Sequence, residues 1–170
     1  MEIPIGKRIS NFIIIIIFSL VIIAIALIVI LKVSFFRING SSMEPTLYPR
    51  ELVLALPCKN PQRGDLIAFD LEGTMTIKRI IGIPGDEVFI DDDGNVYLNG
   101  EKLEEEYTKK KYKGDVEVSN PYKVQKGEYY VLGDNRQDSK DSRLIKVGGI
   151  RKDEIESQVI FSISKFKKIE

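Results

Sequence analysis

The hydrophobic and polar positions divide the chain into one long apolar segment near the N-terminus and a longer region of short apolar runs. The apolar segment, Phe12–Leu31, has 20 residues and is interrupted only by Ser19. A helix of that length covers about 30 Å, the thickness of a bilayer's hydrocarbon core. Cleaved signal peptides have shorter apolar cores, roughly 7–15 residues, followed by a small-residue cleavage site. No such site follows Leu31, so the pattern predicts one uncleaved transmembrane helix over residues 12–33.

Basic residues flank this segment on both sides. Lys7 and Arg8 precede it and favour a cytoplasmic N-terminus, while Lys32 and Arg37 follow it and reduce the asymmetry. The short N-terminal tail and the long C-terminal portion also favour this orientation. We therefore expect a single-pass plasma-membrane protein with the lipid bilayer as a partner, a cytoplasmic tail of residues 1–11 and an extracytoplasmic domain of residues 34–170.

Beyond the apolar segment, short runs bounded by Pro, Gly and Asn predict β-strands. These runs are Glu51–Leu56, Asp65–Leu71, Thr74–Ile81, Val88–Ile90, Val96–Leu98 and Tyr129–Leu132. Asp93-Gly94-Asn95 and Asn99-Gly100 predict hairpin turns. Alternation of Val159, Phe161 and Ile163 with more polar neighbours predicts a half-buried strand near the end. The most polar stretch, residues 101–123, reads as a solvated excursion, so the fold class is mainly β.

Composition excludes several kinds of function. The formal net charge is zero and no basic stripe is interleaved with aromatic residues, which argues against nucleic-acid binding. The chain has one cysteine, Cys58, and therefore no intrachain disulfide. It has no histidine, so Ser-His-Asp and Cys-His catalysis are excluded. The acidic run of residues 91–94 lacks the spacing of a calcium loop, and we expect neither a metal nor a cofactor.

Ser42 is the candidate nucleophile. It lies in a Gly- and Ser-rich turn, where a serine is most often a simple turn residue. Pro45 and Pro49 stiffen the following segment, which would present the hydroxyl with little mobility. The 11 residues from Leu31 to Ser42 span at most about 40 Å, so Ser42 would work close to the bilayer. In the absence of histidine, its base must be Lys, Asp, Glu, Tyr or a terminal amine.

Lys78 is the best candidate for that base. Strand alternation places it on one face with Thr76 and Ile80. A lysine in such a strand is ordinarily solvent-facing, and a catalytic one must be neutral. Its pKa must therefore be lowered by burial or by nearby positive charge, which the surrounding isoleucines and Arg79 could supply.

A third polar segment has Ser139, Asp141 and Arg143 at a spacing of two. If it is extended, these side chains share a face. The Ser139 hydroxyl could then hydrogen-bond the lysine amine, and Asp141 could pair with Arg143. The competing interpretation is a polar loop with local turns.

Four segments in order resemble the motifs of bacterial type I signal peptidases, the membrane-bound Ser-Lys proteases that remove signal peptides from exported proteins. They are residues 40–47 (Gly-Ser-Ser-Met-Glu-Pro-Thr-Leu), 63–65 (Arg-Gly-Asp), 78–86 (Lys-Arg-Ile-Ile-Gly-Ile-Pro-Gly-Asp) and 133–143 (Gly-Asp-Asn-Arg-Gln-Asp-Ser-Lys-Asp-Ser-Arg). The resemblance implies an antiparallel β-sheet core with a small inserted β region, here residues 91–122. It also implies signal-peptide-bearing preproteins as partners.

By the same resemblance, Ser42 attacks the scissile carbonyl and Lys78 is the general base. Ser139 would orient the lysine amine, and Asp141 and Arg143 would hold the floor of the site. Pockets for small residues at substrate positions −1 and −3 would be lined by Ile38, Met43, Leu47 and Ile77. Some members of the family have a serine oxyanion donor where this chain has Gly40, so the backbone N–H of Ser42 would carry more of that task.

Two other interpretations stay open at this point. One is a Ser-Lys protease of the self-cleaving regulatory type, although such proteins need a soluble partner region and this N-terminus is apolar. The other is a membrane-anchored β module that binds exported chains without cutting them. A cleavage assay separates both from a signal peptidase.

Overall fold

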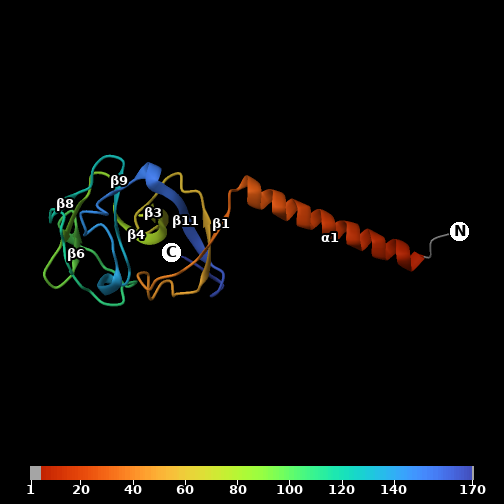
Figure 1. The fold of residues 1–170 in the computed structure, drawn as a ribbon, viewed down its shortest axis with the longest axis horizontal. Coiled ribbons are helices and arrows are strands. Elements are labelled where there is room, and N and C mark those ends of the chain that lie inside the picture. The colour runs from red at the N-terminus through yellow and green to blue at the C-terminus, as the bar shows by residue number, and fades with distance from the viewer. Residues whose placement is uncertain (1–4, 170) are drawn as a thin grey trace. The chain divides into compact units, whose positions relative to one another are not determined.

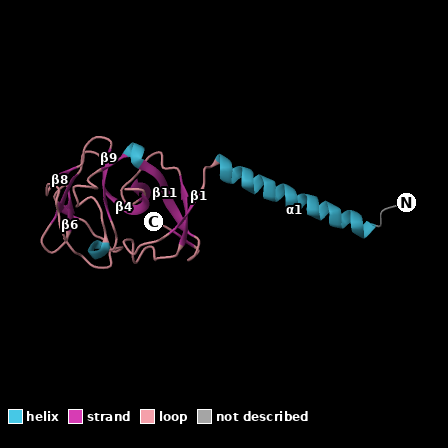
Figure 2. Cartoon of the chain, viewed as in Figure 1, coloured by secondary structure: helices cyan, strands magenta, loops and turns pink. Residues whose placement is uncertain are grey.

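The structure is a computed structural model that describes residues 5–169. The chain forms two compact units, one ending at Val33 and the other beginning at Ser34. The first is a single helix and the second is built from strands (Figures 1 and 2). A mainly antiparallel β fold preceded by one apolar helix was predicted, and this prediction is confirmed.

Helix α1 extends over Ile5–Ile30, and its segment Phe12–Ile30 is long and apolar enough to cross a membrane. The side chains from Phe12 onward are exposed within the unit, as expected for a helix that is apolar on every side. Ser19 returns its hydroxyl to the carbonyls of Ile15 and Ile16, at 3.0 and 2.9 Å, so its polar group is satisfied inside the helix. The helix begins at Ile5, inside the predicted tail; residues 1–4 of that tail lie outside the described residues.

Eight strands of the described chain form one antiparallel sheet in the order β1-β2-β11-β3-β4-β9-β10, with β12 also pairing with β11. Their bounds are β1 Ser34–Arg37, β2 Leu52–Leu56, β3 Leu66–Leu71, β4 Thr74–Gly82, β9 Glu128–Leu132, β10 Ile150–Arg151, β11 Ile155–Ser162 and β12 Lys167–Lys168. Two short 3₁₀ turns, η1 Arg136–Asp138 and η2 Lys152–Glu154, interrupt the connections.

A smaller sheet of four strands has the order β7-β6-β5-β8. Its strands are β5 Glu87–Ile90, β6 Val96–Leu98, β7 Glu101–Lys102 and β8 Tyr122–Lys123. Both predicted hairpins form here. The turn between β6 and β7 has positive φ at Asn99 (53°) and Gly100 (86°), as a type I′ turn requires. The small sheet includes β5 and β8, so it extends slightly beyond the predicted bounds of 91–122.

The centre of the large sheet is buried on both faces. In β3, Leu66 and Ala68 join one apolar cluster, while Ile67 and Phe69 join another on the opposite face. Strand β4 lies next to β3 and pairs Lys78 with Ile67. Lys78 therefore lies on a central strand of the sheet, among buried apolar side chains.

The predicted alternation near the C-terminus is only partly correct. Strand β11 has a register shift between Val159 and Phe161 on its β2 side. A bulge of this kind moves the following side chains to the other face. Ser162 is consequently buried and donates to the carboxylate of Glu51 at 3.2 Å, whereas Phe161 is only half-buried.

Candidate active site

The turn that carries Ser42 is fixed to the core on both sides of the serine. Before the turn, the N–H of Ile38 donates to Glu51 O at 2.9 Å and extends the pairing of β1 with β2. Within it, the N–H of Leu47 donates to Met43 O at 2.8 Å. The Met43 and Leu47 side chains are buried, which contributes about 1.5–3 kcal/mol each. The Ser42 hydroxyl is thus presented by a turn that cannot move without opening the core.

Lys78 reaches this hydroxyl from β4. Its Nζ lies 2.8 Å from Ser42 Oγ, although the two residues are 36 positions apart. A second hydrogen bond joins Nζ to the backbone carbonyl of Ile77 at 3.1 Å. The lysine is 3% exposed, so its amine is held in place by these two contacts and by the surrounding core.

The pKa of Lys78 is lowered to about 8, chiefly because burial removes the ammonium from water. The carboxylates of Asp141, Asp134 and Asp138 oppose this shift, and the guanidinium of Arg143 adds to it. The cation that helps to lower the pKa of Lys78 is therefore Arg143, and the prediction that Arg79 would do so is wrong. A lysine with this pKa has an appreciable neutral fraction at physiological pH.

Arg79 has a different environment because it follows Lys78 on the strand and points to the other side. Its Nε and Nη2 bind the two carboxylate oxygens of Asp134 at 2.9 and 2.8 Å, and Nη1 binds Gly64 O at 2.8 Å. The guanidinium also lies 4.1 Å from the centre of the Tyr107 ring. The Arg79 charge is balanced by the buried carboxylate of Asp134. This ion pair connects β4 to the loop after β9.

Asp141 and Arg143 form the buried pair that their spacing suggested. Arg143 Nε and Nη2 donate to the two Asp141 oxygens at 2.7 and 2.9 Å. One of these oxygens also accepts the N–H of Gly133 at 3.0 Å. The pair therefore joins the two ends of the loop 133–143. It also holds the Asp141 carboxylate and the Arg143 guanidinium close enough to affect the pKa of Lys78.

Ser139 does not make the contact expected of it. Its hydroxyl is buried but has no hydrogen-bond partner among the described residues, and Lys78 binds Ser42 and Ile77 instead. Ser139 is extended (φ −138°, ψ 127°) and packs against Gly133. A Cβ on Gly133 would lie 2.2 Å from Ser139 Oγ, so the serine occupies the space that the glycine leaves open. Packed in this way, the hydroxyl makes no hydrogen bond to the lysine amine.

A groove of about 850 Å³ runs past Ser42 and Lys78. Ile38, Met43 and Ile77 line it as expected, but Leu47 does not, because it is fully buried in the core beneath. Its remaining lining residues include some that the sequence did not single out: Phe36, Met75, Gln137, Asp138, Lys140 and the β3–β4 turn of residues 71–74. No group of acidic, cysteine or histidine side chains in the described residues could hold a metal ion.

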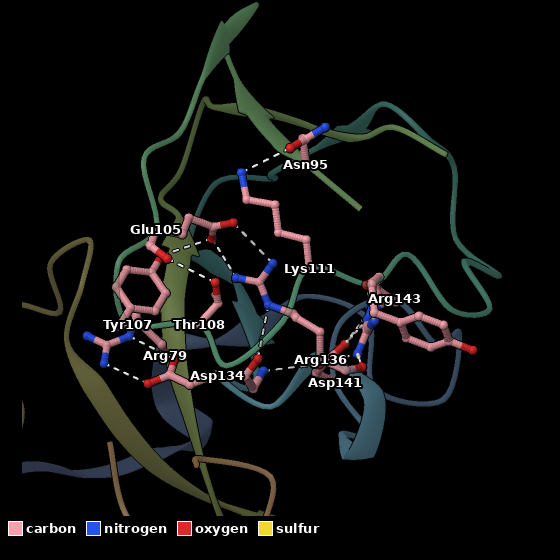
Figure 3. A network of polar contacts seen from close by, with 12 residues as sticks. Arg79, Asn95, Glu105, Tyr107, Thr108, Lys111, Asp134, Arg136, Asp141 and Arg143 are labelled. Carbon is pink, nitrogen blue, oxygen red and sulfur yellow. Dashed lines mark hydrogen bonds and ion pairs between the residues drawn. The ribbon is translucent and has the colours of Figure 1, made fainter. Parts of the chain in front are cut away.

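The polar stretch 101–123 was predicted to be a solvated excursion. This prediction is wrong at Glu105, whose side chain is buried. Glu105 pairs with Arg136, which is buried as well, and accepts the Tyr107 hydroxyl at 2.9 Å (Figure 3). Arg136 Nε also donates to Gly133 O at 3.0 Å. The inserted region thereby contacts and stabilises the loop 133–143. No sequence signal points to this pair, since a glutamate in a run of charged residues usually faces water.

Comparison with known proteins identifies the family. The model of the signal peptidase family, peptidase S26, matches residues 9–164. A signal peptidase I of Bacillus amyloliquefaciens is 39% identical over 137 residues, which cover 72% of this chain and 74% of that protein. Signal peptidase I U of Bacillus subtilis (strain 168) is 37% identical over 145 residues, or 76% of each chain.

A solved structure agrees with these matches. The crystal structure of a signal peptidase I from Enterococcus faecalis V583 has 36% sequence identity and a TM-score of 0.50. The match covers 59% of this chain and 97% of that one. With the family model spanning nearly the whole sequence, the chain belongs to the signal peptidase family, peptidase S26.

Proposed function

We propose that this chain is an endopeptidase that removes N-terminal signal peptides from exported preproteins, with Ser42 as nucleophile and Lys78 as general base. The observation that carries the proposal is the 2.8 Å separation of Lys78 Nζ from Ser42 Oγ, made by a lysine that is almost fully buried. The distance is within the reach a general base needs for the proton it abstracts. Family membership supplies the reaction class.

The neutral form of Lys78 is suited to accept the proton of Ser42. With a pKa of about 8, roughly a tenth of the lysine is neutral at pH 7 and half at pH 8. The amine donates one N–H to Ile77 O, which leaves its lone pair free to face the serine hydroxyl. Burial thus lowers the pKa of Lys78 so that it can act as a base, and the backbone carbonyl of Ile77 orients its amine.

The reaction then proceeds in two halves. Lys78 takes the hydroxyl proton as Ser42 Oγ bonds to the scissile carbonyl carbon. The tetrahedral intermediate collapses when the C–N bond breaks, and Lys78 gives its proton to the departing amine of the mature chain. Neutral Lys78 next deprotonates a water that attacks the ester, which releases the signal peptide as a carboxylate and restores Ser42.

The groove favours a substrate with small side chains at positions −1 and −3. Its walls beside the serine are Ile38, Met43 and Ile77, each less than 10% exposed. These side chains are packed into the core and cannot withdraw to make room, because core packing resists displacement. A small side chain such as that of alanine fits between such walls, and a bulky one does not.

For the membrane we propose a single crossing by α1, with residues 1–11 in the cytoplasm and residues 34–170 outside. The length and apolarity of the helix support the crossing. Lys7 and Arg8 support the orientation. An anchored enzyme and a signal peptide in the same bilayer would share one surface, which raises their local concentration.

The test is cleavage of a preprotein that carries Ala at −3 and −1, in detergent, with the product N-terminus sequenced. The intact chain should cut after the second alanine, and Ser42→Ala should abolish cleavage. Ser119→Ala is the matched control, since Ser119 is an exposed serine remote in sequence from all four motifs. Retained cleavage in Ser42→Ala would overturn the nucleophile assignment.

A further inference from the structure

Asn135 donates hydrogen bonds to two successive backbone carbonyls of the turn that carries Ser42. Its side-chain Nδ2 donates to Ser41 O at 3.1 Å, and its backbone N–H donates to Ser42 O at 2.9 Å. The N–H of Glu44 adds a third bond, to Ser41 O, at 3.0 Å. Two successive carbonyls of the turn are therefore held by one residue of the loop 133–143.

These bonds fix the direction of the Ser42 N–H. The Ser41–Ser42 peptide is not among the cis bonds of the described chain, so its C=O and N–H point in opposite directions. Because the carbonyl faces Asn135, the N–H faces away from it. Within the described residues this N–H has no hydrogen-bond partner, so it is available to a ligand in the groove that Ser42 lines.

Two further features show that the loop is shaped for this contact. An Asn that precedes a 3₁₀ turn commonly caps it with its own side chain, but Asn135 makes no such bond to η1. Its amide is committed to Ser41 instead. Gly133 allows the close approach, because a Cβ there would lie 2.6 Å from Ser42 O.

We infer that Asn135 is a positioning residue that aims the backbone N–H of Ser42 at the oxyanion formed when the serine attacks. The inference rests on the proposed function and extends it, because Gly40 supplies no side-chain donor. A donor is effective only when it is held at about 2.7–3.1 Å from the developing oxyanion. Asn135 would act by preventing rotation of the Ser41–Ser42 peptide, not by touching the substrate.

The test uses Asn135→Ala and Asn135→Asp in the full-length protein in detergent. Aspartate fills the same space and keeps the backbone bond, but it sets a carboxylate oxygen against Ser41 O. Both variants should lose about 10- to 100-fold in kcat, the range expected when a catalytic group is misplaced by up to 1 Å. KM should stay within about twofold, since the donor acts mainly in the transition state.

Three readouts separate this role from a merely structural one. The pH midpoint of kcat should not move in Asn135→Ala, because Asn135 does not bind Lys78 and the variant introduces no charge. Binding of an uncleaved substrate peptide should be equal in Ser42→Ala and in Ser42→Ala combined with Asn135→Ala. The thermal midpoint should fall no further than in Asn120→Ala, a control whose amide clamps Ile90 in the small sheet in a similar way, at 2.9 and 2.8 Å.

Full activity in Asn135→Asp would overturn the inference, and so would a shifted pH midpoint or a raised KM in Asn135→Ala. Loss of activity that is recovered at lower temperature would also overturn it, since it would mark a folding defect. The single variant Ser42→Ala keeps this failure distinct from failure of the proposed function. If Ser42→Ala still cuts, the proposed function fails; if it is inactive while Asn135→Asp cuts normally, only the role of Asn135 fails.

Discussion

Replacing Lys78 by methionine should stabilise the fold at neutral pH, although we expect it to abolish activity. Methionine has a similar length and no charge, so it removes the penalty of holding an ammonium in the core. The folded pKa of about 8 lies below the ordinary value of 10.5. At pH 7 the lysine is therefore mostly charged in both states, and its charge is less favourable in the folded one.

The size of the effect follows from the difference between the two pKa values. The gap between the ordinary pKa of 10.5 and the folded pKa of about 8 corresponds to roughly 3 kcal/mol of lost stability below pH 8. As pH rises from 8 to 10.5 the folded state loses its proton first, and the penalty falls to about 1 kcal/mol at pH 10. The stability gap between Lys78→Met and the intact chain should therefore shrink by about 2 kcal/mol between pH 7 and pH 10.

The assay is denaturant unfolding of the β unit in detergent, followed by circular dichroism because the chain has no tryptophan. The two hydrogen bonds of the lysine amine, worth about 1 kcal/mol each, are lost in the variant and shift the gap at every pH. The change with pH is thus the informative quantity. A gap that stays constant from pH 7 to pH 10 would refute a depressed lysine pKa and the neutral base that depends on it.

The remaining predictions concern activity, specificity and the loop behind the site. The cleavage rate should rise with pH to a plateau, with a midpoint near 8 as Lys78 loses its proton; a flat profile with chemistry rate-limiting would contradict the lysine base. Gly133→Ala should lower kcat by about 100-fold while circular dichroism stays unchanged, because the new Cβ would displace the Ser42 carbonyl, and normal turnover would show that the carbonyl can yield. Glu105→Gln should lower stability by about 3–5 kcal/mol in denaturant unfolding, because it leaves the buried Arg136 charge uncompensated; a loss below 1 kcal/mol would mean that water reaches the site. Phenylalanine in place of alanine at −1 of the substrate should stop cleavage, and continued cutting, seen by gel mobility, would refute the small-residue groove.

The strands and the two hairpins could be predicted from the sequence because their signals are local. Runs such as Leu66–Leu71 are bounded by turn residues, and Asn99-Gly100 requires a particular turn. Lys78 was named as the base of Ser42 from the absence of histidine and from its apolar strand, and the resemblance to a family then supported that pairing. Nothing in either segment alone states that a turn near the N-terminus meets β4.

What the sequence could not predict depends on side-chain partners that are distant along the chain. Glu105 and Arg136 are 31 residues apart, and Glu105 lies in a polar stretch that reads as solvated. Ser139 had the right spacing to face the lysine, but its hydroxyl packs on Gly133 instead. Arg79 was the nearest cation in sequence to Lys78, yet strand alternation sends it to Asp134. Leu47 matched a pocket residue by motif, whereas packing places it fully inside the core.

The role of Lys78 as the base that activates Ser42 is tested by a cleavage time course with Lys78→Ala beside the intact chain. The substrate is a preprotein with Ala at −3 and −1, and Lys126→Ala, which removes an exposed lysine outside the groove, is the control. We expect the intact chain and Lys126→Ala to cut after the second alanine at the same rate, and Lys78→Ala to show no product. Equal cutting by Lys78→Ala would mean that the lysine is only a strand residue and that another group is the base.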